Sequence, residues 1–218
     1  MNEALKNILE RNSHRNLVEP IPSKDEMEKV FQAALRAPDH AWLRPSSFIQ
    51  ISGDGLQKLS DIFVDFAKEN FDDLTEERLE KYKNAPFRAP LIVVLVSTKK
   101  DHPKVHKMEQ IISTGTAGQN IMLALNALGY GAIWRTGSFA FNNKISEKFS
   151  LNENQMIIGY IYIGTSAGKK KSIPKINKAT CDDLKRRSWR RRNQKRTSSA
   201  PTPEPMKLRR RSGSTILA

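Results

Sequence analysis

The sequence predicts an α+β fold, with one sheet flanked by helices around a buried core helix. Residues 91–96, Leu-Ile-Val-Val-Leu-Val, form a continuous apolar run that is typical of a strand covered on both faces. A second strand-like run spans residues 156–163, and helical patterns separate the strand-like runs. No internal repeat divides the chain, so these elements are expected to build one domain.

The core helix is predicted in the middle of the chain. Residues 121–128 are apolar more continuously than an amphipathic surface helix would be, so we expect burial on most sides. The preceding residues, 113–118, are small and allow another backbone or a flat ring to approach closely. Gly129 ends the helix. A strand at 132–134 then carries residues 135–137 to its far end, where they could form part of a site. The alternative is an ordinary helix and strand followed by an exposed arginine.

The elements before the first long strand follow from spacing and capping residues. Apolar residues at helical spacing predict a short first helix that ends near Asn12. Ser23 and Glu26 have the pattern of a capping box, so a second helix begins there, and it stops before Pro38. A strand is expected at 47–51.

Three more helices are predicted on the remaining segments. Apolar residues from Leu56 to Phe66 lie on one helical face, a further helix runs over about 75–84, and a short polar helix covers about 143–149. These helices are expected to cover the sheet.

Donor groups gather in the loop after the first helix. Arg11, Ser13 and Arg15 would suit one phosphate, because guanidinium groups and a hydroxyl complement its oxygen atoms. A solvated turn with scattered charges is the plainer alternative.

The positive charge of the chain is concentrated at its end. The formal net charge is +14, and residues 185–218 hold twelve Lys or Arg and one acid, Glu204. We expect disorder after about Asp183, because like charge with few apolar groups cannot form a core. This segment would bind RNA or anionic lipid through phosphate attraction, or it is an extension without such a role.

Several kinds of site find little support in the sequence. His102, His106 and Glu109 have spacing that suggests a metal, but Pro103 separates the histidines, and we predict no metal site. The motifs GxGxxG and GxxxxGK[ST] are missing, as are a nucleophile elbow and a plausible Cys-His pair, which argues against hydrolases. The single cysteine, Cys181, the absence of an amino-terminal signal and the lack of a membrane-length apolar run predict a cytoplasmic protein.

Three segments together resemble the nitroreductase family of flavoproteins. They are ERNSHR near the start, RAPDHAWLRPSSF after the second helix, and ALGYGAIWRTG after the core helix. With the downstream IIGYIYIGT, their spacing is most similar to the compact YdjA-like branch, over roughly residues 3–165. The resemblance implies a nitroreductase-like fold with a mostly antiparallel sheet, and a homodimer with FMN at the subunit interface.

The resemblance also implies site residues. The residues matching the family's FMN contacts are Arg11, Asn12, Ser13, Arg15, Arg36, His40, Trp134, Arg135 and Thr136. The residues matching its nicotinamide nucleotide segment are Ala124, Leu125, Asn126, Ala127, Leu128 and Gly129. One of Lys169, Lys170 and Lys171 could contact the FMN phosphate. Arg15 falls where a basic side chain commonly faces the flavin pyrimidine, and there it would stabilise the anionic reduced ring.

The chain departs from the family pattern at two of these segments. Asn12 stands where a second arginine is common, which removes one charge near the cofactor. Arg44 precedes Pro45 where glutamine is frequent, and this change bears on substrate access.

The resemblance implies an FMN-dependent NAD(P)H oxidoreductase that reduces nitroaromatics, quinones or a similar acceptor in a ping-pong reaction. No side chain would act as general acid or base, because the hydride passes to and from flavin N5. We expect a flavin-binding domain at 1–172 and a basic tail at 173–218. The alternatives are a nucleic-acid or anionic-surface binding protein that acts through the tail, and a flavin carrier without turnover. The sequence leaves open the acceptor and the choice between NADH and NADPH.

Overall fold

The described strands form one antiparallel sheet. The computed structural model describes residues 1–166, 168 and 172. The strands are β1 (Leu17–Val18), β2 (Ser46–Ser52), β3 (Leu91–Thr98), β4 (Gly131–Arg135) and β5 (Gln155–Ser166). Their order is β1-β5-β3-β2, and β4 also pairs with β5. The sheet is antiparallel at every strand pair in this part of the chain, which confirms the α+β prediction.

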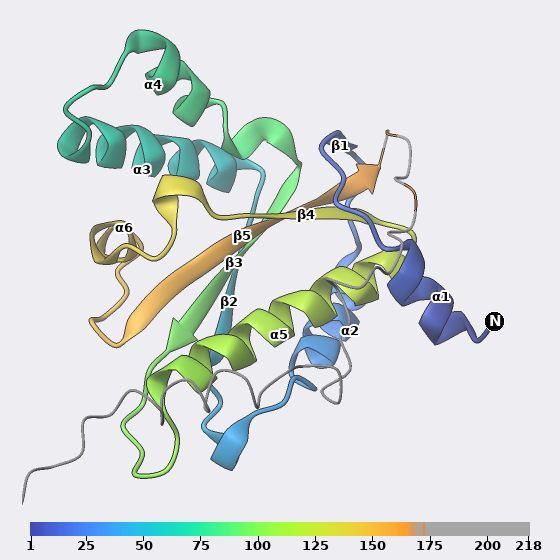
Figure 1. The fold of residues 1–218 in the computed structure, drawn as a ribbon. Coiled ribbons are helices and arrows are strands. Elements are labelled where there is room, and N and C mark those ends of the chain that lie inside the picture. Colours follow the sequence, from blue (N-terminus) through green and yellow to red (C-terminus); the bar gives the residue numbers. More distant parts are fainter. Residues whose placement is uncertain (167, 169–171, 173–218) are drawn as a thin grey trace, which may run out of the picture. The chain divides into compact units, whose positions relative to one another are not determined.

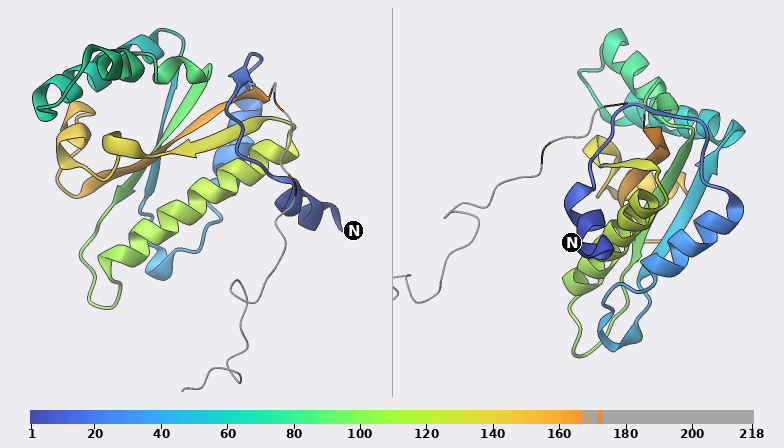
Figure 2. Two further views of the ribbon diagram at one scale, coloured as in Figure 1. Left: turned by 45° about the horizontal axis from the view of Figure 1, so that its top comes forward. Right: turned by 90° about the vertical axis from the view of Figure 1, so that its right-hand side faces the viewer.

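Helices cover both faces of this sheet. The α-helices are α1 (Glu3–Glu10), α2 (Lys24–Ala34), α3 (Asp54–Asn70), α4 (Glu76–Lys83), α5 (Lys107–Ala127) and α6 (Asn143–Lys148). Short 3-10 helices are η1 (His40–Trp42), η2 (Pro86–Arg88) and η3 (Gly137–Phe139). α2 and α5 lie on one face, and α3, α4 and α6 lie on the other (Figures 1 and 2).

β3 separates two apolar cores. Ile92, Val94 and Val96 pack with α3 and α6, whereas the alternate residues Leu91, Val93 and Leu95 pack with α2 and α5. This alternation follows from the period of two of a strand, and it leaves the six side chains at most 1% exposed. The prediction of a central strand covered on both faces is confirmed.

Most predicted helices are present, with small differences at their ends. The capping box of α2 is formed: the Ser23 hydroxyl accepts from Glu26 N, and the Glu26 carboxylate accepts from Ser23 N. α1 ends at Glu10, two residues before the predicted end, because the chain turns outward at Arg11. The sequence did not predict β1, since two residues carry no periodicity.

α5 is buried against the sheet and α2 but keeps an exposed stripe within one chain. Ile121 and Leu125 are fully buried. Met108 and Ile112 on its first turns are 54% and 61% exposed, and Leu128 just beyond its end is 40% exposed. The described residues therefore leave these three apolar side chains uncovered.

The small residues of α5 accommodate a ring of the protein itself. A Cβ atom on Gly118 would lie 2.7 Å from both Leu95 and the Trp134 ring, and the same indole lies directly over Gly159 in β5. Gly159 stands where the register of β3 and β5 shifts, so the bulge and the missing side chain together make room for the indole. The flat ring expected against α5 is thus Trp134, and it joins α5, β4 and β5.

Candidate active site

A cavity of about 510 Å³ opens where β4 ends. Its walls come from α3, α4 and η2, from β4 and η3, and from β5. The lining residues are Phe63, Lys81, Tyr82, Ala85, Arg88, Trp134, Arg135, Thr136, Gly137, Ser138, Phe139, Tyr160 and Tyr162. The cavity combines aromatic rings with cationic groups, and its volume is in the range of small-molecule sites.

Arg135 is the most constrained cation in this cavity. Its guanidinium carbon lies 5.4 Å from the centre of the Tyr162 ring, and Nε is a buried donor without a hydrogen-bond partner among the described residues. Burial lowers the pKa of Arg135, and the charges of Arg88 and Arg15 lower it further. A buried donor that lacks a partner is costly, so this group is suited to an anionic or carbonyl-bearing ligand.

Two tyrosines form the floor of the cavity. Burial raises the pKa of Tyr162 to about 12, although the nearby charges of Arg135 and Arg88 oppose this rise. Burial also raises the pKa of Tyr160, whose hydroxyl donates to Phe139 O at 2.7 Å. Both phenols therefore keep their protons at neutral pH, and the Tyr162 hydroxyl is a donor at the cavity.

The donor-rich loop runs along the outer edge of β4. Ser13 forms a parallel bridge with Ala132, and His14 N donates to Ala132 O at 3.1 Å. The His14 ring contacts Ser166 Oγ at 2.6 Å, which fixes the loop to β5 as well. The charge of Arg15 lowers the pKa of Arg135, so the predicted segments 11–15 and 134–136 lie near each other.

The triplet before Arg15 has mixed environments. The Asn12 amide donates to Glu10 O at 2.7 Å, so this side chain is engaged with the chain itself. Arg11 is half-buried and Ser13 is exposed. Neither residue is among those that line the cavity, so their predicted contact with a phosphate stays a prediction.

Arg36 and His40 lie on a different part of the chain, beyond α2. His40 Nδ1 contacts Glu109 Oε2 at 2.9 Å, on the first turn of α5. This contact, followed by the bond from His106 N, lowers the pKa of Glu109. α1, by contrast, meets the other end of α5, where Asn126 donates to Asn7. Since a helix rises 1.5 Å per residue, Glu109 and Asn126 are about 25 Å apart, so His40 and α1 lie at opposite ends of α5.

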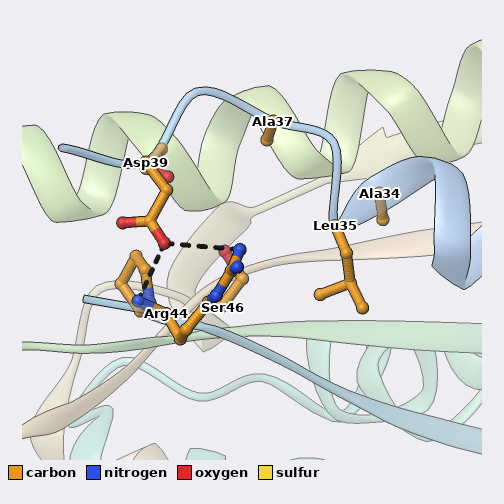
Figure 3. Close-up of a pocket in the computed structure, with 8 residues that line it drawn as sticks. Ala34, Leu35, Ala37, Asp39, Arg44 and Ser46 are labelled. Carbon is orange, nitrogen blue, oxygen red and sulfur yellow. Dashed lines mark hydrogen bonds and ion pairs between the residues drawn. The ribbon is translucent and has the colours of Figure 1, made fainter. Parts of the chain in front are cut away.

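The segment that follows His40 is held in an unusual conformation. Ala41, Trp42 and Arg44 all have positive φ values, of 57°, 54° and 50°. The Asp39 carboxylate stabilises it by accepting from the amides of Leu43 and Arg44. Figure 3 shows the contacts of this carboxylate with Arg44. The adjacent pocket holds only about 30 Å³, room for one water molecule and not for a cofactor.

The predicted nucleotide segment forms the last turn of α5 and the residues after it. Leu125 is fully buried and Asn126 is bonded to Asn7, whereas Ala127, Leu128 and Gly129 are exposed. Gly129 has a φ of 87°, which ends the helix as predicted. The three exposed positions are those that a nucleotide could reach.

The candidate metal ligands have other partners. The His106 ring accepts from Met108 N as the cap of α5, and Glu109 accepts from His106 N and contacts His40. No group of three or more His, Cys, Asp or Glu in the described residues could hold a metal ion. Lys169–Lys171 and the predicted tail at 173–218 lie outside the described residues.

Sequence reasoning missed Arg88 and Tyr162. Arg88 stands alone before the β3 run, and Tyr162 belongs to an apolar strand pattern, so neither residue forms a motif. The available signal was the alternation in β5, which places Tyr160 and Tyr162 on one face. Their meeting with Arg135 depends on strand pairing, which a single sequence does not specify.

Comparisons with known proteins agree on one family. A model of the nitroreductase family matches residues 8–165. "Putative NAD(P)H nitroreductase YdjA" from Escherichia coli strain K12 is 34% identical over 163 residues, which are 75% of this chain and 88% of that protein.

Solved structures share the fold. A nitroreductase-like family protein from Bacillus cereus has a TM-score of 0.69 at 22% identity, covering 82% of this chain and 94% of the other. A nitroreductase with bound FMN from Bacteroides fragilis NCTC 9343 has a TM-score of 0.65 at 19% identity, covering 84% and 100%. No helix in the part of the chain described is long and apolar enough to cross a membrane.

Proposed function

The chain belongs to the nitroreductase family, and we propose on this basis that it is an FMN-dependent NAD(P)H oxidoreductase that reduces nitroaromatics, quinones or a similar acceptor. The relative from Escherichia coli is named an NAD(P)H nitroreductase, and the structural neighbour from Bacteroides fragilis is described with bound FMN. These names support the donor and the cofactor for this chain.

The observation that carries the proposal is the cavity at the end of β4. Its aromatic walls suit a flat ring, and its cationic groups suit a ligand that carries negative charge. The partnerless Nε of Arg135 supplies a donor that a ring carbonyl would satisfy. The residues present therefore fit FMN.

We assign separate tasks to the two neighbouring segments. Arg11 and Ser13 would hold the phosphate, together with a lysine of the 169–171 segment. Arg15, Arg135 and Thr136 would hold and orient the ring, and Trp134 would fix the strand that presents them. The exposed turn at 127–129 would receive the nicotinamide nucleotide.

FMN bound here would supply the hydride chemistry, and the chain supplies binding and orientation. NAD(P)H gives up a hydride and leaves as NAD(P)⁺. The acceptor gains two electrons and two protons. The hydride carries both electrons and one proton, and water can provide the second proton. Nothing in this balance requires a side chain to act as general acid or base.

A second copy of the chain would complete the site. His40 lies about 25 Å along α5 from the α1 end, so it would reach an FMN at the α1 end only in another subunit. We assign Arg36, which precedes it on the same segment, to the same half-site. The exposed apolar side chains on α1 and α5 support a homodimer that places FMN at the interface.

Steady-state kinetics test this function. Purified protein supplied with FMN should oxidise NADH or NADPH at a rate that depends on the concentration of an added nitroaromatic or quinone. Parallel double-reciprocal lines are expected, because donor and acceptor would react with the same flavin in turn. Bound FMN without acceptor-dependent oxidation would indicate a flavin carrier instead.

A further inference from the structure

The backbone of Arg88 is anchored at the wall of the cavity. It ends η2, between Pro86, which is buried, and Ala89, which is 2% exposed. Its own side chain is exposed and lines the cavity beside Arg135 and Tyr162. The backbone is therefore anchored by its neighbours, while the guanidinium is free to meet a ligand.

The cavity gathers cations without matching acids. Arg15 and Arg88 both act on the charge of Arg135, and none of the three forms an ion pair within the described residues. No Asp or Glu is among the described residues that line the cavity. Arg78, on α4, shows the contrasting arrangement, because it pairs with Asp73 at 2.6 Å. Cations that repel each other in a cavity are stabilised by a negative charge placed between them.

We propose that Arg88 is a cofactor-binding residue that, with Arg15 and Arg135, stabilises the negative charge of reduced FMN and so sets its midpoint potential. The inference rests on the proposed function and adds a residue to the predicted site. The oxidised ring is neutral and the reduced ring carries negative charge, so a fixed cation favours the reduced form.

The test compares the binding of oxidised and reduced FMN to the full chain. Arg88→Ala should weaken the reduced form about tenfold more than the oxidised form, which for a two-electron couple lowers the midpoint potential by about 30 mV. Binding is followed by flavin fluorescence, and the potential by anaerobic titration with a reference dye. Arg88→Lys should restore most of the potential, because the charge remains.

Lys58→Ala is the matched control. Lys58 is an exposed cation on α3 that does not line the cavity and is not among the charges that act on Arg135. Its removal should leave the midpoint potential unchanged. Thermal melting of each apoprotein checks that the variants are folded.

Three results would overturn the inference while leaving the proposed function intact. One is a wild-type potential in Arg88→Ala, another is equal weakening of both redox forms, and the third is the same shift in Lys58→Ala. A wild-type protein that binds no FMN would instead refute the proposed function itself.

Discussion

At the scale of single residues, the site depends on a half-buried arginine and a buried phenol. Arg135 lies 5.4 Å from the centre of the Tyr162 ring, and such a stack is worth about 0.5–2 kcal/mol according to its solvation. The stack orients the guanidinium while its buried Nε keeps no partner within the described residues. Arg135 is thus preorganised for a ligand.

The phenol of Tyr162 should have a higher pKa than that of a tyrosine in water. Its pKa is about 12 in the folded protein, against about 10 for a tyrosine in water, because burial disfavours the phenolate. A raised pKa means that the folded state retains the proton between pH 10 and 12 after the unfolded state has lost it. This contribution to the free energy of unfolding is therefore fully present below pH 10. It amounts to about 2–3 kcal/mol and is lost as the pH rises from 10 to 12.

A pH-jump titration of tyrosinate absorbance measures this pKa. Tyr162→Phe should remove the step near pH 12 from the titration of the folded protein. A Tyr162-dependent step at pH 10 would show that the phenol is solvated and that the cavity floor is not as described.

The residues of the site differ in how far the sequence reveals them. Arg135 and Thr136 follow a predicted strand and a recognisable segment, so the sequence places them at a strand end. Arg88 and Tyr162 reach the same cavity only through the pairing of β3 and β4 with β5. That register depends on pairs such as Arg135 with Tyr160, 25 positions apart, and Leu91 with Ile163, 72 positions apart, which no local pattern encodes.

At the scale of elements, the Trp134 indole joins α5, β4 and β5. It occupies the space left by Gly118 on α5 and by Gly159 at the bulge in β5. Because protein interiors are close-packed, an added methyl group at either glycine has nowhere to go. The orientation of β4, and hence of Arg135, depends on this packing.

Two glycines of α5 should respond in opposite ways to the same substitution. Gly118→Ala would place a Cβ 2.7 Å from Leu95 and the Trp134 ring, and we expect destabilisation of about 1–3 kcal/mol from overpacking. Gly115→Ala, one turn away, meets the ring at an ordinary 3.9 Å and should stabilise by up to about 1 kcal/mol through helix propensity. Urea denaturation of the two variants measures both effects, and equal effects would contradict this packing.

Some element boundaries can be predicted from local sequence patterns, and others cannot. The box at Ser23 and Glu26 is a local arrangement of two side chains, so the start of α2 is predictable from four residues. β1 and the positive φ values at Ala41, Trp42 and Arg44 have no such signal. Asp39 stabilises that conformation through amides of the same segment, a geometry that follows from the folded loop and not from residue type alone.

At the scale of the whole molecule, one chain presents two separated halves of the predicted site. The segments at 11–15 and 134–136 meet at β4, whereas Arg36 and His40 lie beyond α2. Family resemblance identifies both halves, but only the structure shows their separation. A homodimer would reunite them and cover the exposed stripe of α5.

Ile112→Glu should disrupt this homodimer. Ile112 is 61% exposed on α5, and an unpaired carboxylate buried there would cost about 3 kcal/mol or more in each of two symmetric copies. Light scattering should show a monomer, with weaker FMN binding because the half-site of the partner is lost. Lys58→Glu introduces a carboxylate on α3, across the sheet, and should remain dimeric.

A dimeric Ile112→Glu variant with normal FMN affinity would contradict this account of the interface. A monomeric wild-type protein that binds FMN fully would also contradict it, since one chain would then hold the cofactor without Arg36 and His40 of another.

The absorption spectrum of the purified protein, recorded before and after anaerobic addition of NADPH and then NADH, tests the central claim most directly. We expect a flavin spectrum that bleaches with one or both donors, and the donor that acts at the lower concentration is the preferred one. A protein that stays colourless after incubation with FMN, or a bound flavin that neither donor reduces, would contradict the assignment.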